Sequence, residues 1–370
     1  MSRFIARSFF ALFLLVILWG CATTPAPRKE AVPVFYPPFP NSARIQYLAS
    51  FSSAADLGKP QSGFASYIVG KDPKEKLVVK KPYGVAISDG KIYVTDPGGP
   101  GYAVFDLKSR KLKGVAGSGA GRMKKPANIM IDKDGSKYVT DTGADQVLVF
   151  DKEDNFIRAY GVKDQFRPAG VAISGDRLYV SDLRHHEIHV LYKLTGKLLF
   201  KFGKPGQKEG ELYYPTNMVI APDNYLYVTE LGNFRIQKFT LDGKPARIYG
   251  EIGDRPGQFA RPKGVAVDRE GNIYAVDAAF ENIQVFNQEG KLLLFFGQPG
   301  ANREDINLPT AMAIDYENAP LFQQYAAPKF KVEYVILVAS QFGASKVNVF
   351  GFGKMEGMDY TVQEQPVTKK

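Results

Sequence analysis

The three histidines of the chain, His185, His186 and His189, fall within five consecutive residues. Imidazole is a common zinc ligand and the usual proton-transfer group near neutral pH. The spacing of the three residues could bind a metal weakly at the surface. Such residues are more commonly polar turn groups accompanied by one strand residue. The sequence therefore predicts no metal site here.

The other reactive side chains do not form a catalytic set. The chain contains no GxSxG elbow, Walker loop or paired-histidine helix motif. Cys21 is the only cysteine, so the chain has no internal disulfide, Cys-rich zinc site or covalently attached c-type haem. We therefore predict no catalytic residue and favour binding over catalysis.

The N-terminus has the pattern of an export signal. Arg3 and Arg7 precede an apolar run from Phe9 to Trp19, which is too short for a mature membrane-spanning helix. We assign residues 1–20 to a signal peptide. An uncleaved signal anchor, with a passive thiol at Cys21, is the alternative.

The residues around Cys21 resemble a lipobox, which is the processing site of bacterial lipoproteins. The segment Leu18-Trp19-Gly20-Cys21 departs from that pattern at Trp19 and fits it elsewhere. The resemblance implies a diacylglycerol and a fatty acid such as palmitate on Cys21. Ala22 stands where an Asp would retain a lipoprotein at the inner membrane, so we expect anchoring to the outer membrane, facing the periplasm or the surface.

Residues 21–43 contain six prolines, which disfavour a helix or a central strand and indicate an extended tether. The formal charge of the chain falls from +10 to +8 when the two arginines of the signal peptide are removed. Lys and Arg are dispersed along the chain, which indicates solubility and a weak preference for anionic partners.

A six-residue motif beginning with proline recurs at spacings of 42 to 47 residues. The six copies are PYGVAI from Pro82, PANIMI from Pro126, PAGVAI from Pro168, PTNMVI from Pro215, PKGVAV from Pro262 and PTAMAI from Pro309. Each is followed by further short alternating segments, which predict four strands per repeat and hence a propeller blade.

The second strand of most repeats ends in an acid. These residues are Asp96, Asp141, Asp182, Glu230 and Asp277, with Ser340 in the sixth copy. A carboxylate at this position can accept the backbone N–H groups of the following turn. We expect this structural role because the acid recurs from blade to blade.

The segment 264–297, GVAVDREGNIYAVDAAFENIQVFNQEGKLLLFFG, closely resembles the NHL-repeat consensus, and the resemblance covers roughly residues 80–352. It implies an all-β, six-bladed propeller with four antiparallel strands per blade. The sixth repeat lacks its outermost strand. We predict that residues 44–51 supply it by pairing with residues 346–351, so that the propeller spans 44–352 and a polar tail spans 353–370.

The start of each innermost strand is expected to line the central channel. Those positions hold Gly84, Asn128, Gly170, Asn217, Gly264 and Ala311. Six-bladed gluconolactonases and paraoxonases hold calcium there, and resemblance to them suggests Asn128, Asn217 and Glu230 as calcium ligands in an alternative, lactonase-like enzyme. Amidating lyases use histidines from several blades, which this chain does not offer.

An insertion of about sixteen residues, ENAPLFQQYAAPKFK with its flanks, interrupts the sixth repeat. Its aromatic residues are Tyr316, Phe322, Tyr325 and Phe330. They are either partner-binding anchors or residues that fold back over the blade. Arg184, Asn233 and Arg235 form a further set, which either lines one face or belongs to solvated turns.

The sequence thus predicts a membrane-anchored binding or scaffold module in the cell envelope. Its partner is a protein or a polysaccharide, and the chain is a monomer or a subunit of a hetero-complex. No resident cofactor is expected, and nucleic acid is not expected as a partner of an exported lipoprotein.

Overall fold

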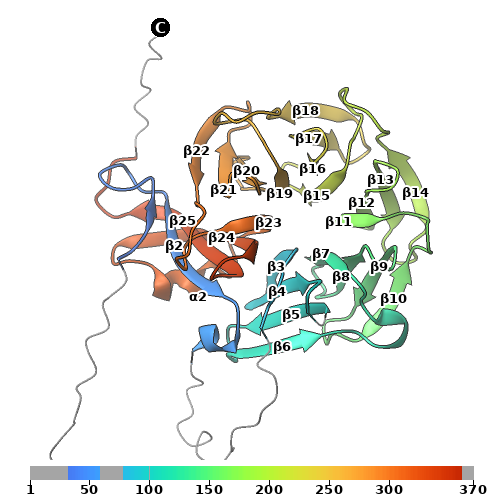
Figure 1. Cartoon of the computed structure of the whole chain (residues 1–370), viewed down its shortest axis with the longest axis horizontal. Helices are drawn as coiled ribbons and strands as arrows, with labels where there is room; N and C mark the ends of the chain where they lie inside the picture. Colours follow the sequence, from blue (N-terminus) through green and yellow to red (C-terminus); the bar gives the residue numbers. More distant parts are fainter. Residues whose placement is uncertain (1–31, 59–77, 100, 361–370) are drawn as a thin grey trace, which may run out of the picture. The chain divides into compact units, whose positions relative to one another are not determined.

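A computed structural model describes residues 32–58, 78–99 and 101–360. The chain divides into the units Met1–Pro33 and Val34–Lys370. The predicted signal peptide and Cys21 lie outside the described residues. The second unit contains six antiparallel sheets arranged in a ring (Figure 1), which confirms the predicted six-bladed β-propeller.

Blades one to three each contain four strands in sequence order. Blade one comprises β3 (Val85–Ser88), β4 (Lys91–Asp96), β5 (Gly101–Asp106) and β6 (Lys111–Val115). Blade two comprises β7 (Pro126–Ile131), β8 (Lys137–Asp141), β9 (Gln146–Phe150) and β10 (Phe156–Tyr160). Blade three comprises β11 (Pro168–Ser174), β12 (Arg177–Asp182), β13 (Glu187–Tyr192) and β14 (Leu198–Phe202).

Blades four and five repeat this order, and blade six departs from it. Blade four comprises β15 (Pro215–Ile220), β16 (Tyr225–Glu230), β17 (Arg235–Thr240) and β18 (Pro245–Tyr249). Blade five comprises β19 (Pro262–Val267), β20 (Ile273–Asp277), β21 (Asn282–Phe286) and β22 (Leu292–Phe296). Blade six comprises β23 (Asn307–Asp315), β24 (Phe330–Phe342), β25 (Val347–Met355), β2 (Ile45–Phe51) and β1 (Phe35–Tyr36).

The hydrophobic cores lie between neighbouring blades. In β12, Leu178 and Val180 pack with residues of blade two, and Tyr179 between them packs with residues of blade four. All three side chains are fully buried because alternate residues of a strand point to opposite faces. Burial on both faces explains why these strands are almost continuously apolar.

Hydroxyl groups and glycines join the innermost strands near the axis. Thr95 Oγ1 accepts the N–H of Gly84 and donates to the carbonyl of Ala127 in the next blade, both at 2.7 Å. A Cβ on Gly84 would lie 2.8 Å from that carbonyl oxygen, and one on Gly170 would lie 2.3 Å from the Thr216 carbonyl oxygen. The repeated glycine is thus required by close approach of the blades.

The strand-end acids bind backbone amides as predicted. Asp141 Oδ2 accepts the N–H of Lys124, and its Oδ1 accepts those of Lys125, Gly143 and Ala144, at 2.5 to 3.0 Å. The carboxylate therefore fixes both the turn that follows its strand and the segment that enters the blade. Asp96 and Asp277 likewise use both oxygens on backbone groups.

The predicted ring closure is confirmed. Strand β2 pairs antiparallel with β25, with Gln46 opposite Gly351 and Phe51 opposite Val347. The first and last strands of the propeller therefore share one sheet, so the open edge of blade six is paired by the same chain.

The folded unit extends beyond the predicted limits at both ends. Within the range assigned to the tether, β1 pairs with β2, and Phe35 packs against Phe330. Within the range assigned to the tail, the Tyr360 hydroxyl donates to the Ala43 carbonyl at 2.7 Å, and the Arg44 guanidinium lies over its ring. These contacts attach both flanks to blade six.

The antiparallel strands define two faces. The turns between second and third strands and the connections between blades lie at one face, which we call the connector face. The turns between first and second strands, and between third and fourth strands, lie at the opposite face, which we call the hairpin face. The insertion of blade six lies on the hairpin face because it joins β23 to β24.

Candidate functional site

Two of the predicted channel residues meet at the axis. Asn128 Nδ2 donates to Asn217 Oδ1, and Asn217 Nδ2 donates to the carbonyls of Lys263 at 3.0 Å and Thr310 at 2.9 Å. The contacts link blades two, four, five and six. The amide groups are therefore paired with each other and with the backbone, whereas calcium ligands would direct their oxygens to one common point.

A cavity of about 220 Å³ lies among the innermost strands, next to these two asparagines. Its other lining residues are mainly aliphatic, and they include Gly264 and Ala311 as predicted. Gly84 and Gly170 were also expected to line the channel, but they face the neighbouring blades at the close approaches described above. An apolar wall supplies no acid, base or nucleophile for catalysis.

Glu230, the third predicted channel residue, has a different position. Its carboxylate accepts the N–H of Tyr213 at 2.9 Å and side-chain N–H groups of Asn233, Arg235 and Gln237 at 2.6 to 2.7 Å. It is fully buried in the strand-end network of blade four. The sequence assignment to the channel was wrong because a second-strand carboxylate turns toward the connector face and not toward the axis.

The further set predicted from the sequence, Arg184, Asn233 and Arg235, contains both internal and surface residues. Arg235 is buried and donates to the carbonyls of Gln207, Lys208 and Glu211. With Asn233 it stabilises the connection that enters blade four. Arg184 pairs with Asp145 at 3.1 Å and with Asp164 at 2.7 Å, and only this member of the set is on the surface.

The insertion of blade six folds back on the propeller. It contains α2 (Ala319–Phe322) and the 3-10 turn Gln323–Tyr325. Phe322 and Phe330 are buried at 0 and 1% exposure, so they are core residues and not anchors. The Tyr316 hydroxyl accepts the N–H of Arg269, and its ring packs on Tyr334. Tyr325 remains 44% exposed and is the one predicted anchor that faces solvent.

An exposed aromatic cluster on the connector face was not predicted. It consists of His186, Tyr213 and Tyr214, which we call the tyrosine patch, and its ring centroids lie 4.6 to 4.8 Å apart. The Tyr214 N–H donates to His186 Nδ1 at 2.9 Å. Burial lowers the pKa of His186, which favours the neutral ring that this bond requires. The two tyrosines are 40 and 43% exposed.

A sequence signal for the patch existed. The residue before the repeat proline is basic in four repeats, as Lys81, Lys125, Arg167 and Arg261, whereas it is Tyr214 in the fourth repeat and Leu308 in the sixth. Gly232 provides the space, because a Cβ there would lie 2.3 Å from the Tyr213 ring. An aromatic residue at this position occurs in the fourth repeat alone among the six.

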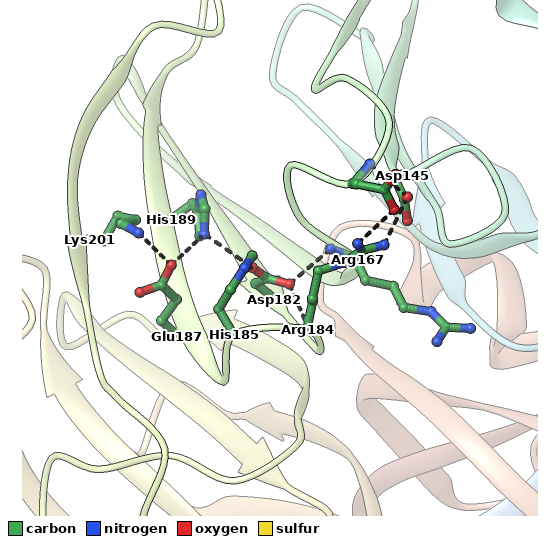
Figure 2. A network of polar contacts seen from close by, with 9 residues as sticks. Asp145, Arg167, Asp182, Arg184, His185, Glu187, His189 and Lys201 are labelled. Atoms are coloured by element: carbon green, nitrogen blue, oxygen red, sulfur yellow. Dashed lines mark hydrogen bonds and ion pairs between the residues drawn. The ribbon is translucent and has the colours of Figure 1, made fainter.

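Blade three also carries a cluster of four groups able to bind a metal, Asp182, His185, Glu187 and His189 (Figure 2). One donor atom from each lies within 4.8 Å of the others. Asp182 Oδ2 is 2.6 Å from His185 Nδ1 and 3.2 Å from His189 Nε2. Glu187 Oε1 is 2.9 Å from the same His189 nitrogen. Asp182 and His189 are buried, whereas His185 is exposed.

The charge of Asp182 is stabilised by its surroundings. Burial raises the pKa of its carboxyl, but the proximity of His189 and hydrogen bonds from the Arg167 amide and His185 lower it more. The pKa therefore lies well below its ordinary value. At neutral pH the group is a carboxylate, which is the protonation state needed to bind a cation.

No protein-family model matches the chain. Among solved structures, a protein of unknown function from Bacteroides thetaiotaomicron is similar at TM-score 0.56 and 16% identity, over 83% of this chain and 75% of that one. An auxiliary nutrient binding protein from the same organism is similar at TM-score 0.54 and 14% identity, over 76% of this chain and 74% of that one.

A streptogramin B lyase is also similar, at TM-score 0.52 and 18% identity, over 74% of this chain and 83% of that one. At these identities the likeness supports the propeller fold alone. The NHL resemblance of the repeats stays a prediction. No helix among the described residues is long and apolar enough to span a bilayer.

Proposed function

We propose that this chain is an exported, lipid-anchored binding module that docks on a polysaccharide of the cell envelope through the tyrosine patch. The observation that carries the proposal is the pair of exposed rings, Tyr213 and Tyr214, held against His186 on the connector face. Flat aromatic side chains offer a large contact area at a small entropy cost and still provide hydroxyl groups for hydrogen bonds.

The patch is fixed before any ligand binds. Glu230 accepts the Tyr213 N–H, and His186 accepts the Tyr214 N–H. The Tyr213 ring lies directly against Gly232, where no side chain intervenes. A surface that is already ordered loses little conformational entropy on binding. The formal charge of +8 that remains once the signal peptide is removed adds an attraction for acidic polysaccharides, which are anionic partners of the kind expected from the sequence.

Binding is favoured over channel catalysis by the residues at the axis. Asn128 and Asn217 use their amides on each other and on the backbone, and the walls beside them are aliphatic. The similar nutrient binding protein is an example of this fold in a protein named for binding. The calcium-dependent alternative would require the asparagine pair to separate and further oxygen ligands to enter.

The proposal is tested by sedimentation of the purified chain with insoluble cell-wall polysaccharide. The Tyr213→Ala and Tyr214→Ala variants should each weaken binding by about 30-fold, the effect of losing an aromatic anchor. Tyr325→Ala is the matched control, because Tyr325 is equally exposed but lies on the hairpin face. Equal binding by all four proteins, or capture of a protein partner with no polysaccharide binding, would reject the proposal.

The lipid anchor has a separate test. Cys21 is the single cysteine, so Cys21→Ser should abolish incorporation of labelled palmitate and move the protein from the membrane to the soluble fraction. Retention of the label would reject lipidation at Cys21. Fractionation of the parent then decides between the outer membrane, which we propose, and the inner membrane.

A further inference from the structure

We propose that Asp182, His185, Glu187 and His189 form a binding site for one divalent transition metal ion, with zinc as the best match. Two imidazole nitrogens and two carboxylate oxygens are ligands that zinc accepts in a four-coordinate site. The site lies within blade three and is independent of the proposed polysaccharide binding. It differs from a channel site because all four ligands come from the end of β12, the following turn and the start of β13.

The spacing of the donor atoms fits a small ion. Ligands about 2.0 to 2.1 Å from a tetrahedral zinc are separated by roughly 3.3 Å from one another. The measured separations are 2.6, 2.9 and 3.2 Å, and all four donor atoms lie within 4.8 Å. The remaining pairs of donor atoms are at most 4.8 Å apart, so a common centre requires movements of up to about 1.5 Å, and the exposed side chain of His185 has room to move.

His189 provides a second, independent observation. Its ring is 4% exposed, and neither ring nitrogen makes a hydrogen bond within the described part of the chain. Nε2 nevertheless lies between Asp182 and Glu187, close to both carboxylates but without hydrogen-bond geometry to either (Figure 2). Buried polar groups are normally paired, and a buried imidazole nitrogen between two carboxylates is a donor set that a divalent cation can bind.

The strand-end acids of the other blades have different partners. In blade four, Glu230 Oε1 accepts the side-chain donors of Arg235 and Gln237. In blades one, two and five, the second oxygen of the strand-end carboxylate accepts a backbone N–H, from Lys80, Lys124 and Ala260 respectively. In blade three, Asp182 Oδ1 accepts the N–H groups of Arg167 and Arg184, whereas Oδ2 faces the two histidines. One oxygen keeps the structural role, and the other is directed to the proposed ion.

Lys201 competes for one of the proposed ligands, Glu187. Its ammonium lies 2.7 Å from Glu187 Oε1, and its side chain is 44% exposed, so it can turn into solvent when a metal binds (Figure 2). The lysine charge would oppose the bound cation at this distance. Removal of this charge should therefore strengthen metal binding, which is an effect that a purely structural hydrogen-bond cluster would not produce.

The test uses the untagged full chain in detergent, freed of metal with a chelator. Zinc chloride is titrated by calorimetry, and cobalt chloride is followed by visible absorption, which reports the coordination geometry. One ion per chain and the bands of tetrahedral cobalt are expected. A parent protein that binds neither ion would overturn the proposal, as would binding of several weak ions per chain.

Variants distinguish a site from nonspecific surface binding. His185→Gln replaces an exposed side chain. Loss of a residue that only orients a metal ligand lowers metal affinity by roughly 10- to 100-fold, so loss of the ligand His185 should lower zinc affinity by at least that much. His186→Gln removes the neighbouring histidine, whose ring belongs to the tyrosine patch, and should leave zinc affinity unchanged. Lys201→Met should raise it. Equal losses in His185→Gln and His186→Gln would overturn the assignment.

The variants also separate this inference from the proposed function. His185→Gln should lose zinc and retain the two patch tyrosines, whereas Tyr213→Ala should retain zinc. Polysaccharide binding that persists in the zinc-free His185→Gln protein would leave both proposals intact. Zinc binding by a protein that sediments with no polysaccharide would support the metal site and reject the proposed function.

Discussion

Blades two and three each bury one basic side chain, and these two side chains differ in their hydrogen bonds. Lys137 in blade two is 1% exposed, donates to the carbonyls of Asp151 and Lys152 at 2.7 to 2.8 Å, and pairs with Asp154 at 2.9 Å. His189 in blade three is buried to nearly the same degree and makes no hydrogen bond among the described residues.

The difference separates a structural group from a candidate ligand. A buried ammonium whose donors are all directed at acceptors is part of the fold, because the surroundings compensate for its lost hydration. A buried imidazole with two carboxylates nearby but no hydrogen bond is instead a candidate metal ligand. The following predictions test this distinction, from the largest expected effect to the smallest.

Removing the partner of Lys137 should destabilise the propeller. Asp154→Asn leaves the buried ammonium without its counter-charge, and we expect the free energy of unfolding to fall by about 3 kcal/mol in urea denaturation. The double variant Asp154→Asn with Lys137→Met should recover most of the loss. A cost below about 1 kcal/mol for the single variant would mean that the two carbonyls suffice for Lys137.

The same pair predicts an acid-sensitive contribution. Burial raises the pKa of Asp154, but hydrogen bonds from Lys137, Lys113 and Tyr102 lower it more, so the net pKa lies below its ordinary value. A carboxyl with a lowered folded-state pKa stabilises the fold above its unfolded value of about 3.9 and loses that contribution as the pH falls through the folded value.

The stability difference between the parent and Asp154→Asn should therefore be full at pH 7 and shrink below about pH 4. Urea denaturation of both proteins at pH 7, 5 and 3 measures it. A difference that does not change between pH 7 and 3 would assign the effect of the variant to packing and not to charge.

His189→Leu should affect stability less than Asp154→Asn. Without metal, the gain from removing a buried ring that makes no hydrogen bond is offset by the loss of the group that lowers the pKa of Asp182, so the free energy of unfolding should change by less than about 1 kcal/mol. With zinc at 100 times its dissociation constant, the parent should gain about 2.7 kcal/mol and the variant nothing. A variant that is strongly destabilised without zinc would place His189 with Lys137 among the structural groups.

The tyrosine patch should show the smallest effect on stability. Tyr213→Ala and Tyr214→Ala alter half-exposed side chains and should change the free energy of unfolding by less than about 1 kcal/mol. Thermal and urea denaturation, run beside Tyr325→Ala on the hairpin face, check this. A large loss for either patch residue would mean that the rings hold blades three and four together.

Much of the fold followed from local patterns. Six blades were predicted from the repeated proline motif and the strand-end acids. The pairing of residues 44–51 with 346–351 was predicted from the missing strand of the sixth repeat. These features repeat, so each copy supports the interpretation of the others. Phe322 and Phe330 were ambiguous because an insertion occurs once, and burial of a single loop depends on the surfaces that it meets.

The sequence by itself determined the architecture and showed no recognisable catalytic motif, whereas the export signal before Cys21 stays a prediction. The tertiary structure alone decided which repeated positions depart from their role. Asp141 and Asp182 occupy the same place in the repeat, yet only the backbone around each shows that Asp141 uses both oxygens on amides while Asp182 turns one toward His185 and His189. Strand periodicity specifies the face on which a side chain lies, whereas the partner it meets depends on loops that carry no period.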